Sequence, residues 1–254
     1  MMRLARKSSI IHAGKERDSC SSASVAVPSN ISTNKPSENL SNRTGGGVVL
    51  DIGTGDGRFV YQSARLNPSK FFIGIDANPK ALEKISEKIY RKPAKGGLPN
   101  VLFLQAAVED LPAELFGVAE EIHIHFPWGS LLRAVATAEL EVLNALRRLC
   151  APGCLLEIVI GLDPERDRTE IERLGLPALS NRYLETVLLH RYRAAGFDVL
   201  EKGVLSQADW SHLQTSWARK LGGNEERLVV YLIAQASAST IPDDSSLATN
   251  PAGL

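Results

Sequence analysis

A glycine-rich segment with two acids follows an apolar run near residue 50. The apolar run 48–50 leads into 51–57, which reads Asp-Ile-Gly-Thr-Gly-Asp-Gly. Glycines let the backbone turn sharply at the carboxyl end of a buried strand and come close to a ligand. A second apolar run, 71–75, ends at Asp76, whose carboxylate can accept hydrogen bonds from a ribose diol. Asp51 and Asp56 disfavour a phosphate here and favour a nucleoside with a cationic amine, although another α/β protein can carry such a turn.

Aromatic residues follow a later strand pattern. Phe126-Pro127-Trp128-Gly129 comes directly after the predicted strand 121–125. An aromatic ring beside a rigid proline forms a stacking wall for a planar base. Trp217 lies in the connection between the last two predicted strands, so the two tryptophans are candidates to sandwich an extruded base. Packing of either tryptophan in the core is the alternative.

A helix predicted over 79–92 has one strongly basic face. At about 100° per residue, its cations share one stripe and its large apolar residues the opposite side. The stripe consists of Lys80, Lys84, Lys88, Arg91 and Lys92, facing away from Leu82, Ile85 and Ile89. Lys95 extends the basic surface into the next loop. We expect contact with a phosphate backbone, the alternative being a solvated face paired with Glu83 and Glu87.

Alternating strand and helix patterns must position these residues. Apolar runs predict strands over 48–50, 71–75, 101–105, 121–125, 155–161, 199–205 and 228–236. Helical patterns cover 58–66, 79–92 and 131–149, then two shorter segments closed by Gly196, and 207–221. Such alternation predicts a parallel sheet flanked by helices, with an antiparallel final hairpin.

Composition limits the chain to one large domain. Its 254 residues are 44% hydrophobic, and no apolar run approaches the ~20 residues of a membrane span, which predicts a soluble, cytoplasmic protein. We expect a Ser-rich disordered arm over 1–47, a domain over 48–236 and a disordered tail over 237–254. The basic start of the arm faintly resembles a transit peptide. The domain has 22 basic and 24 acidic residues, so RNA would need a local basic patch.

The cysteines and histidines predict no metal site. Cys20, Cys150 and Cys154 have neither a zinc spacing nor the pattern of a disulfide framework. His123 and His125 alternate along a predicted strand with no obvious third ligand in the sequence. We therefore expect histidines of the core or of the pocket rim.

Four blocks of sequence carry a specific resemblance. The glycine loop resembles the first motif of class I S-adenosylmethionine methyltransferases. Together, 51–58, 92–100, 126–130 and 216–221 resemble the aminoglycoside-resistance 16S rRNA (adenine-N1) methyltransferases, the KamB and NpmA group. The likeness runs from about 48 to 236, in order and at matching separations.

The resemblance implies a fold and an activity. The fold is an α/β, Rossmann-like class I methyltransferase with a seven-stranded, mostly parallel sheet, an antiparallel last strand and helices on both faces. The activity is S-adenosylmethionine-dependent methylation of N1 of an adenine in the decoding A site of 16S rRNA within the 30S subunit. Aminoglycoside resistance and a monomeric enzyme follow from the same resemblance.

The resemblance also assigns roles to residues of this chain. The cofactor set is Asp51, Gly53, Gly55, Asp76, Ala107, Val108 and Glu109, with Ser130 and Thr215 as polar neighbours of the reacting centre. The base would lie between Trp128 and Trp217, beside Phe126 and Pro127. Phosphates of the rRNA would meet Lys88, Arg91, Lys92, Lys95, Arg219, Lys220 and Arg227.

Some features depart from related patterns and leave alternatives open. Phe126 stands where methyltransferases of exocyclic amines place a polar residue, which favours attack by a ring nitrogen. The family usually has an arginine where this chain reads Asn224-Glu225-Glu226, and its N-terminal hairpin has no match in the arm. A tRNA guanine-N7 methyltransferase, a small-molecule methyltransferase and a non-catalytic RNA-binding relative remain alternatives.

Overall fold

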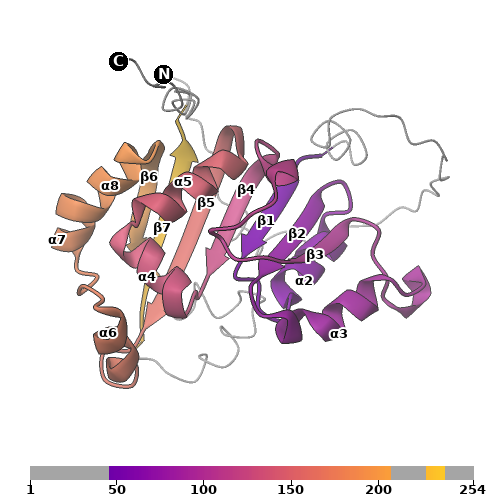
Figure 1. The fold of residues 1–254 in the computed structure, drawn as a ribbon, viewed down its shortest axis with the longest axis horizontal. Helices are drawn as coiled ribbons and strands as arrows, with labels where there is room; N and C mark the ends of the chain where they lie inside the picture. Colours follow the sequence, from indigo (N-terminus) through magenta and orange to yellow (C-terminus); the bar gives the residue numbers. More distant parts are fainter. Residues whose placement is uncertain (1–45, 207–226, 238–254) are drawn as a thin grey trace, which may run out of the picture.

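One twisted sheet forms the centre of the molecule. The structure, a computed structural model, describes residues 46–206 and 227–237. Its seven-stranded sheet has the order β3-β2-β1-β4-β5-β7-β6 (Figure 1). The strands are β1 (Val48–Ile52), β2 (Phe71–Asp76), β3 (Val101–Gln105), β4 (Ala119–His125), β5 (Cys150–Leu162), β6 (Phe197–Val204) and β7 (Leu228–Ala236).

The pairing of the strands confirms the predicted fold class. Strands β1 to β5 pair in parallel, whereas β7 is antiparallel to both β5 and β6. The chain builds β1, β2 and β3 outward in one direction and then returns to add β4 and β5 on the other side of β1. A crevice forms at the carboxyl ends of the strands where the direction of winding changes, between β1 and β4.

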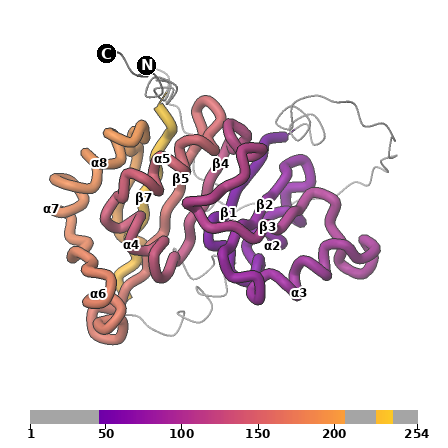
Figure 2. The backbone as a smooth tube through the Cα atoms, viewed as in Figure 1, coloured from indigo at the N-terminus to yellow at the C-terminus, as the bar shows by residue number. Residues whose placement is uncertain are grey.

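Helices cover both faces of the sheet. Residues of α2 and α3 pack on one face, and residues of α4, α5 and α8 pack on the other (Figures 1 and 2). The α-helices are α2 (Arg58–Leu66), α3 (Pro79–Ile89), α4 (Gly129–Thr137), α5 (Leu140–Leu149), α6 (Arg168–Leu174), α7 (Asn181–Tyr183) and α8 (Leu189–Ala194). Short helical turns complete the described part: η1 (Pro93–Lys95), η2 (Ala113–Leu115) and the π-helical η3 (Leu184–Leu188). None of the described helices is long and apolar enough to span a membrane.

The core is two apolar clusters separated by the sheet. In β1, Leu50 faces the larger cluster beneath α4 and α5, whereas Val49 faces the smaller cluster beneath α2. Side chains alternate along a strand, so Asp51 points to the same side as Val49. The first strand therefore delivers one carboxylate to the α2 face, at the end of an otherwise apolar run.

The helix that carries the basic stripe starts and packs as its sequence predicts. Asn78 caps α3 by accepting a hydrogen bond from the Lys80 backbone N–H at 3.1 Å, and Pro79 occupies the first turn. Leu82 and Ile89 are buried, as the apolar stripe requires. The helix ends at Ile89, three residues earlier than predicted, because the chain turns there into η1.

One helix differs from the sequence-based expectation. The predicted helix 131–149 is two helices, because Ala138 adopts a left-handed conformation with φ of 53° between α4 and α5. The last strand, β7, forms the predicted antiparallel hairpin with β6 and lies between β5 and β6 in the sheet. The helix predicted over 207–221 and the disorder predicted over 1–47 and 237–254 fall almost wholly outside the described residues. Cys150 and Cys154 are free and buried, which agrees with structural roles.

The core packing predicts a strong difference between two leucines of α5. Leu146 is fully buried beneath the sheet, so L146A should lower the free energy of unfolding by about 3 kcal/mol through lost burial and a cavity. Leu140 begins the same helix but is 56% exposed, so L140A should cost less than about 1 kcal/mol. Urea denaturation of both variants tests this, and equal losses would contradict the assignment of α5 to the core.

Candidate functional site

The glycine loop is held against the end of the neighbouring strand. Backbone N–H groups of Gly53 and Thr54 both donate to the Ile75 carbonyl, at 2.8 and 3.0 Å. Gly53 and Gly55 have φ of +74° and +57°, a conformation that residues with side chains rarely adopt. A Cβ on Gly53 would also lie 2.8 Å from a methyl of Leu131. Glycine is therefore required at both positions, and at Gly53 for two reasons.

Asp76 is fixed by two backbone donors. One carboxylate oxygen accepts from the Gly55 N–H at 2.7 Å, and the other accepts from the Asn78 N–H at 2.8 Å. A carboxylate has about four acceptor sites, so two remain for a ligand. The end of β2 thus presents an oriented acceptor pair, the arrangement that a ribose diol needs.

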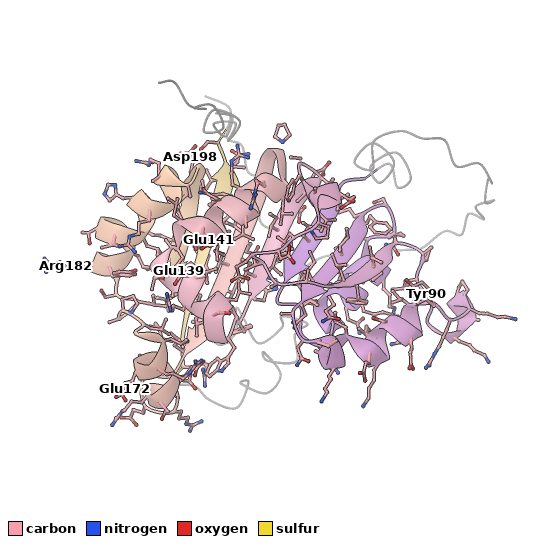
Figure 3. The ribbon with its side chains drawn as sticks, in the orientation of Figure 1. Tyr90, Glu139, Glu141, Glu172, Arg182 and Asp198 are labelled. Atoms are coloured by element: carbon pink, nitrogen blue, oxygen red, sulfur yellow. The ribbon has the colours of Figure 1, made fainter. Side chains whose placement is uncertain are left out.

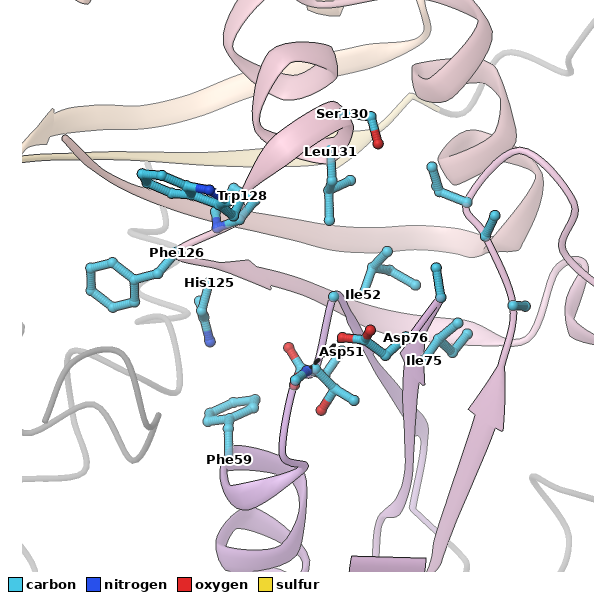
Figure 4. A pocket seen from close by; sticks show the side chains of 18 of the residues that line it. Asp51, Ile52, Phe59, Ile75, Asp76, His125, Phe126, Trp128, Ser130 and Leu131 are labelled. Carbon is cyan, nitrogen blue, oxygen red and sulfur yellow. Dashed lines mark hydrogen bonds between the residues drawn. The ribbon is translucent and has the colours of Figure 1, made fainter. Parts of the chain in front are cut away.

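These groups line one cavity at the carboxyl edge of the sheet. The cavity has a volume of about 530 Å³, and it is bounded by the ends of β1, β2, β3 and β4 (Figure 4). Its lining includes every predicted site residue of the described chain outside the basic surface: Asp51, Gly53, Gly55, Asp76, Ala107, Val108, Glu109, Phe126, Pro127, Trp128 and Ser130. The structure therefore brings the predicted cofactor and base residues together around a single space.

Asp51 is the buried acid of the cavity. Its side chain is only 3% exposed, and burial raises the pKa of its carboxyl above the usual range, with His125, Thr54 and His123 acting in the opposite direction. A buried acid of this kind favours a cationic ligand, because the positive charge stabilises the carboxylate.

Two histidines and two glutamates lie on the same face of the sheet as Asp51, beneath the pocket. His125 Nε2 lies 3.2 Å from Glu157 Oε1, and His123 Nε2 lies 3.4 Å from Glu121 Oε2. Although burial opposes it, hydrogen bonds with His123 and Lys70 hold the pKa of Glu121 at about 2. One potential donor atom from each of His123, His125 and Glu157 lies within 4.8 Å of the others. In the described structure these imidazoles are hydrogen-bonded to carboxylates, and the prediction of no metal stays a prediction.

Phe126 and Trp128 have different roles at the rim. The Phe126 ring is buried in the smaller cluster and points away from Asp51 and Asp76, whereas Trp128 is 41% exposed (Figure 4). Phe126 adopts φ of 49°, which is rare without glycine, and its N–H donates to the Val159 carbonyl at 2.7 Å. A Cβ on Gly161 would lie 2.9 Å from the Phe126 ring. Phe126 therefore anchors the turn that presents Trp128.

The predicted basic surface projects from the far end of α3 (Figure 3). Arg91, Lys92 and Lys95 are exposed around Tyr90, which is itself 79% exposed. Lys88 is only half-buried, and its ammonium lies 3.8 Å from the centroid of the Tyr61 ring. The loop is fixed from below, because the Tyr61 hydroxyl donates to the Gly96 carbonyl at 2.9 Å.

Arg227 does not fit its predicted role. Its side chain is 7% exposed, and Nη1 donates to Asp167 Oδ2 at 2.7 Å and to the Gly161 carbonyl at 3.2 Å. A guanidinium held in a buried ion pair is not presented to an external phosphate. The prediction that Arg227 contacts phosphate is therefore wrong. Its partner Asp167 lies 60 residues earlier in the chain, so the sequence alone does not reveal this ion pair. The predicted site residues within 207–226, which are Thr215, Trp217, Arg219 and Lys220, lie outside the described residues.

The cavity is also lined by residues that the predicted site set did not contain. Among them are Phe59, His125 and Leu131, which come from α2, β4 and α4. For His125 a signal existed, since it shares the strand face of His123 and directly precedes the aromatic block. For Phe59 and Leu131 the sequence offers only apolar residues near a helix start, which is a common pattern.

Comparisons with known proteins identify a family for the chain. A family model described as NpmA, 16S rRNA (adenine(1408)-N(1))-methyltransferase, matches residues 32–236. A 16S rRNA (adenine(1408)-N(1))-methyltransferase of Streptoalloteichus tenebrarius is 40% identical over 184 residues, covering 72% of this chain and 84% of the relative.

Two solved structures are similar in fold and sequence. The aminoglycoside resistance methyltransferase NpmB1 is 47% identical, with a TM-score of 0.67 over 79% of this chain and 93% of the other. A mutant 16S rRNA (adenine(1408)-N(1))-methyltransferase from Catenulisporales acidiphilia, solved with the cosubstrate SAM, is 31% identical, with a TM-score of 0.71 over 84% and 96%. With the family model covering most of its length, this chain belongs to the NpmA family of 16S rRNA (adenine(1408)-N(1))-methyltransferases.

Proposed function

We propose that this protein transfers a methyl group from S-adenosylmethionine to N1 of an adenine in the decoding A site of 16S rRNA, within the 30S subunit. The observation that carries the proposal is one cavity that joins the buried Asp51 and the half-buried Asp76 to the exposed Trp128. The relatives named for the same reaction support it. We propose that the enzyme acts as a cytoplasmic monomer without a metal.

The residues of the cavity fit S-adenosylmethionine. Asp76 offers oriented acceptor oxygens for the ribose hydroxyls, and the buried Asp51 suits the cationic methionine portion. Ala107, Val108 and Glu109 line the side of the cavity where the adenine would lie. When bound, the cofactor supplies an electrophilic methyl group on a sulfonium. Ser130, at the start of α4, is a polar neighbour of the reacting centre.

The chain contributes chiefly by positioning the substrate base. Trp128 offers an aromatic face at the mouth of the cavity, and Trp217 is proposed to cover the other face of the base. Pro127 and the anchored Phe126 fix the direction of Trp128. Adenine N1 has an in-plane lone pair, so no general base is needed to start the reaction. Holding the base in one orientation then accounts for most of the acceleration.

The basic surface is proposed to dock on folded rRNA. Arg91, Lys92 and Lys95 are fixed in an exposed group, and Arg219 and Lys220 are proposed to join them. A rigid charged patch recognises the shape of an RNA backbone instead of a linear sequence. Methylation at N1 adds positive charge and bulk at the base, which opposes a polycationic aminoglycoside and accounts for resistance.

The experiment that tests the function maps the methylated base. The protein is incubated with tritiated S-adenosylmethionine and separately with 30S subunits, free 16S rRNA, tRNA and small amines, and reverse-transcription stops are then located. Labelling of 30S subunits with one stop at a decoding-site adenine is expected. Labelling of tRNA would support a tRNA guanine-N7 methyltransferase, and labelling of an amine would support a small-molecule methyltransferase. Membership of the adenine-N1 family does not favour either alternative.

Removing the negative charge of Asp76 should weaken the binding of the cofactor. D76N keeps the size of the side chain but turns one acceptor oxygen into a donor amide, so S-adenosylmethionine affinity measured by calorimetry should fall at least about tenfold. D198N, on the exposed β6 carboxylate far along the sheet, is the matched control and should bind as wild type. Equal affinities for wild type and D76N would contradict the ribose assignment.

Removing the Trp128 ring should affect the base and spare the cofactor. Because stacking on an aromatic contributes about 1–3 kcal/mol per base, W128A should lower methyl transfer to 30S subunits by about 10- to 100-fold. Cofactor affinity should stay within about twofold of wild type, and W128F should recover part of the rate. An equal loss of cofactor binding in W128A would argue against a base-stacking role.

Neutralising the basic surface should weaken docking in a salt-dependent way. The triple variant R91A/K92A/K95A should bind 30S subunits more weakly, with a smaller slope of log affinity against log salt, since fewer counterions are released. R182A/R191A/R193A removes three exposed arginines from α7 and α8 and serves as the control. If both triple variants lose affinity equally, general charge and not this surface would explain binding.

A further inference from the structure

An exposed aromatic ring stands within the basic surface at the end of α3. Tyr90 follows the last residue of this helix and is 79% exposed, whereas Trp128, at 41%, is the other exposed aromatic residue in the described part of the chain. Tyr90 is not among the residues that line the cavity, so the site described above does not account for its exposure. The surroundings of the ring indicate what kind of group would cover it.

Cations surround Tyr90 along the chain. Every residue of 90–95 is exposed, and this segment contains Arg91, Lys92 and Lys95 and no acid. Figure 3 shows Tyr90 at the end of α3, away from the sheet. An apolar protein surface placed over the ring would bury these cations without partners, which is costly. An RNA offers phosphates to the cations and planar bases to the ring.

The backbone on both sides of Tyr90 is fixed by hydrogen bonds. The Arg91 N–H donates to the Lys88 carbonyl at 3.2 Å, and the Leu98 N–H donates to the Ile89 carbonyl at 3.1 Å. Below the loop, Lys88 also lies over the Tyr61 ring, with 3.8 Å between its ammonium and the ring centroid. The ring of Tyr90 is therefore presented at one place relative to the cations that follow it.

The chemistry of RNA decides which group this ring would meet. Bases inside an A-form duplex are stacked on one another and are not open to a side chain, whereas unpaired bases of loops and bulges stack on aromatic residues. Contacts to phosphates position a protein on RNA but carry no sequence information, because the same group repeats along the backbone. A single unpaired base held beside those phosphates would define one register for docking.

We propose that Tyr90 stacks on an unpaired nucleobase of 16S rRNA, and that this contact sets the register in which the basic surface docks. The inference rests on the proposed function and adds a base contact separate from the target adenine at Trp128. Arg91, Lys92 and Lys95 bind the neighbouring phosphates, and Tyr90 takes no part in methyl transfer.

The first test measures the affinity for 30S subunits at several salt concentrations. Because stacking releases no counterions, Y90A should weaken binding by about tenfold at every salt concentration and leave the slope of log affinity against log salt unchanged. The triple variant R91A/K92A/K95A should instead reduce that slope. Y90F keeps the ring and should bind within about twofold of wild type.

An exposed leucine on the other face of the sheet provides the matched control. L140A removes an apolar side chain that is 56% exposed on α5, and it should bind 30S subunits as wild type does. Affinity for S-adenosylmethionine should be unchanged in every variant, since none of these residues lines the cavity. Thermal melts establish that each variant is folded.

The second test identifies the partner of the ring. Benzoylphenylalanine is incorporated at position 90, the protein is bound to 30S subunits and irradiated, and the crosslink is located by reverse transcription and mass spectrometry. One crosslinked nucleotide in an unpaired region of 16S rRNA, different from the methylated adenine, is the expected result.

Several outcomes would overturn the inference. Wild-type affinity in Y90A removes the contact, a smaller salt slope in Y90A makes it electrostatic, and an equal loss in Y90F assigns it to the hydroxyl instead of the ring. A crosslink to a ribosomal protein, or only to paired RNA, also contradicts it. All of these results require a wild type that methylates 30S subunits; a wild type that does not would instead refute the proposed function.

Discussion

The site depends on the attachment of the first glycine loop to the second strand. The backbone N–H groups of Gly53 and Thr54 donate to the Ile75 carbonyl near the end of β2. The Gly55 N–H donates to the side chain of Asp76. These three bonds join the ends of β1 and β2 and fix the position of the loop at the edge of the cavity. Left-handed backbone at the glycines makes this geometry possible. The same bonds orient Asp76, and the cavity therefore has its acceptor group in place before any ligand arrives.

Negative and positive side chains lie at different depths in the molecule. Carboxylates and imidazoles lie beneath the cavity on the α2 face, while arginine and lysine side chains are exposed beyond the end of α3. The separation of negative from positive side chains follows from the periodicity of the strand and of the helix. In β1, side chains alternate between the two faces, so Asp51 lies on the same face as Val49. In α3, the 3.6-residue repeat places the basic residues opposite the buried Leu82 and Ile89. A cation in the pocket and a polyanion on the surface can thus be bound without competing for the same groups.

Much of this arrangement could be predicted from the sequence, because local patterns determine it. Strand β1, helix α2 and strand β3 follow directly from periodicity and from glycine and proline signals, and Asp51 and Asp76 are recognised by their place after apolar runs. The break at Ala138 was missed because no glycine or proline marks it. Contacts across the fold were also missed: Arg227 with Asp167, and His125 with Glu157, are 60 and 32 residues apart. Their pairing depends on strand order, which periodicity does not encode.

The loop after α3 has a consequence for the kinetics of association. Its backbone is fixed at both ends, since Leu98 donates to the Ile89 carbonyl at 3.1 Å and Gly97 to the Lys92 carbonyl at 3.2 Å, while a Cβ on Gly97 would overlap the Arg91 carbonyl. Little backbone entropy is then left to lose when this loop meets a surface. The loop can therefore bind a rigid polyanion without a change in its own backbone. The rate of association is then limited by diffusion and orientation and is increased by electrostatic steering, because no segment of the loop has to become ordered first.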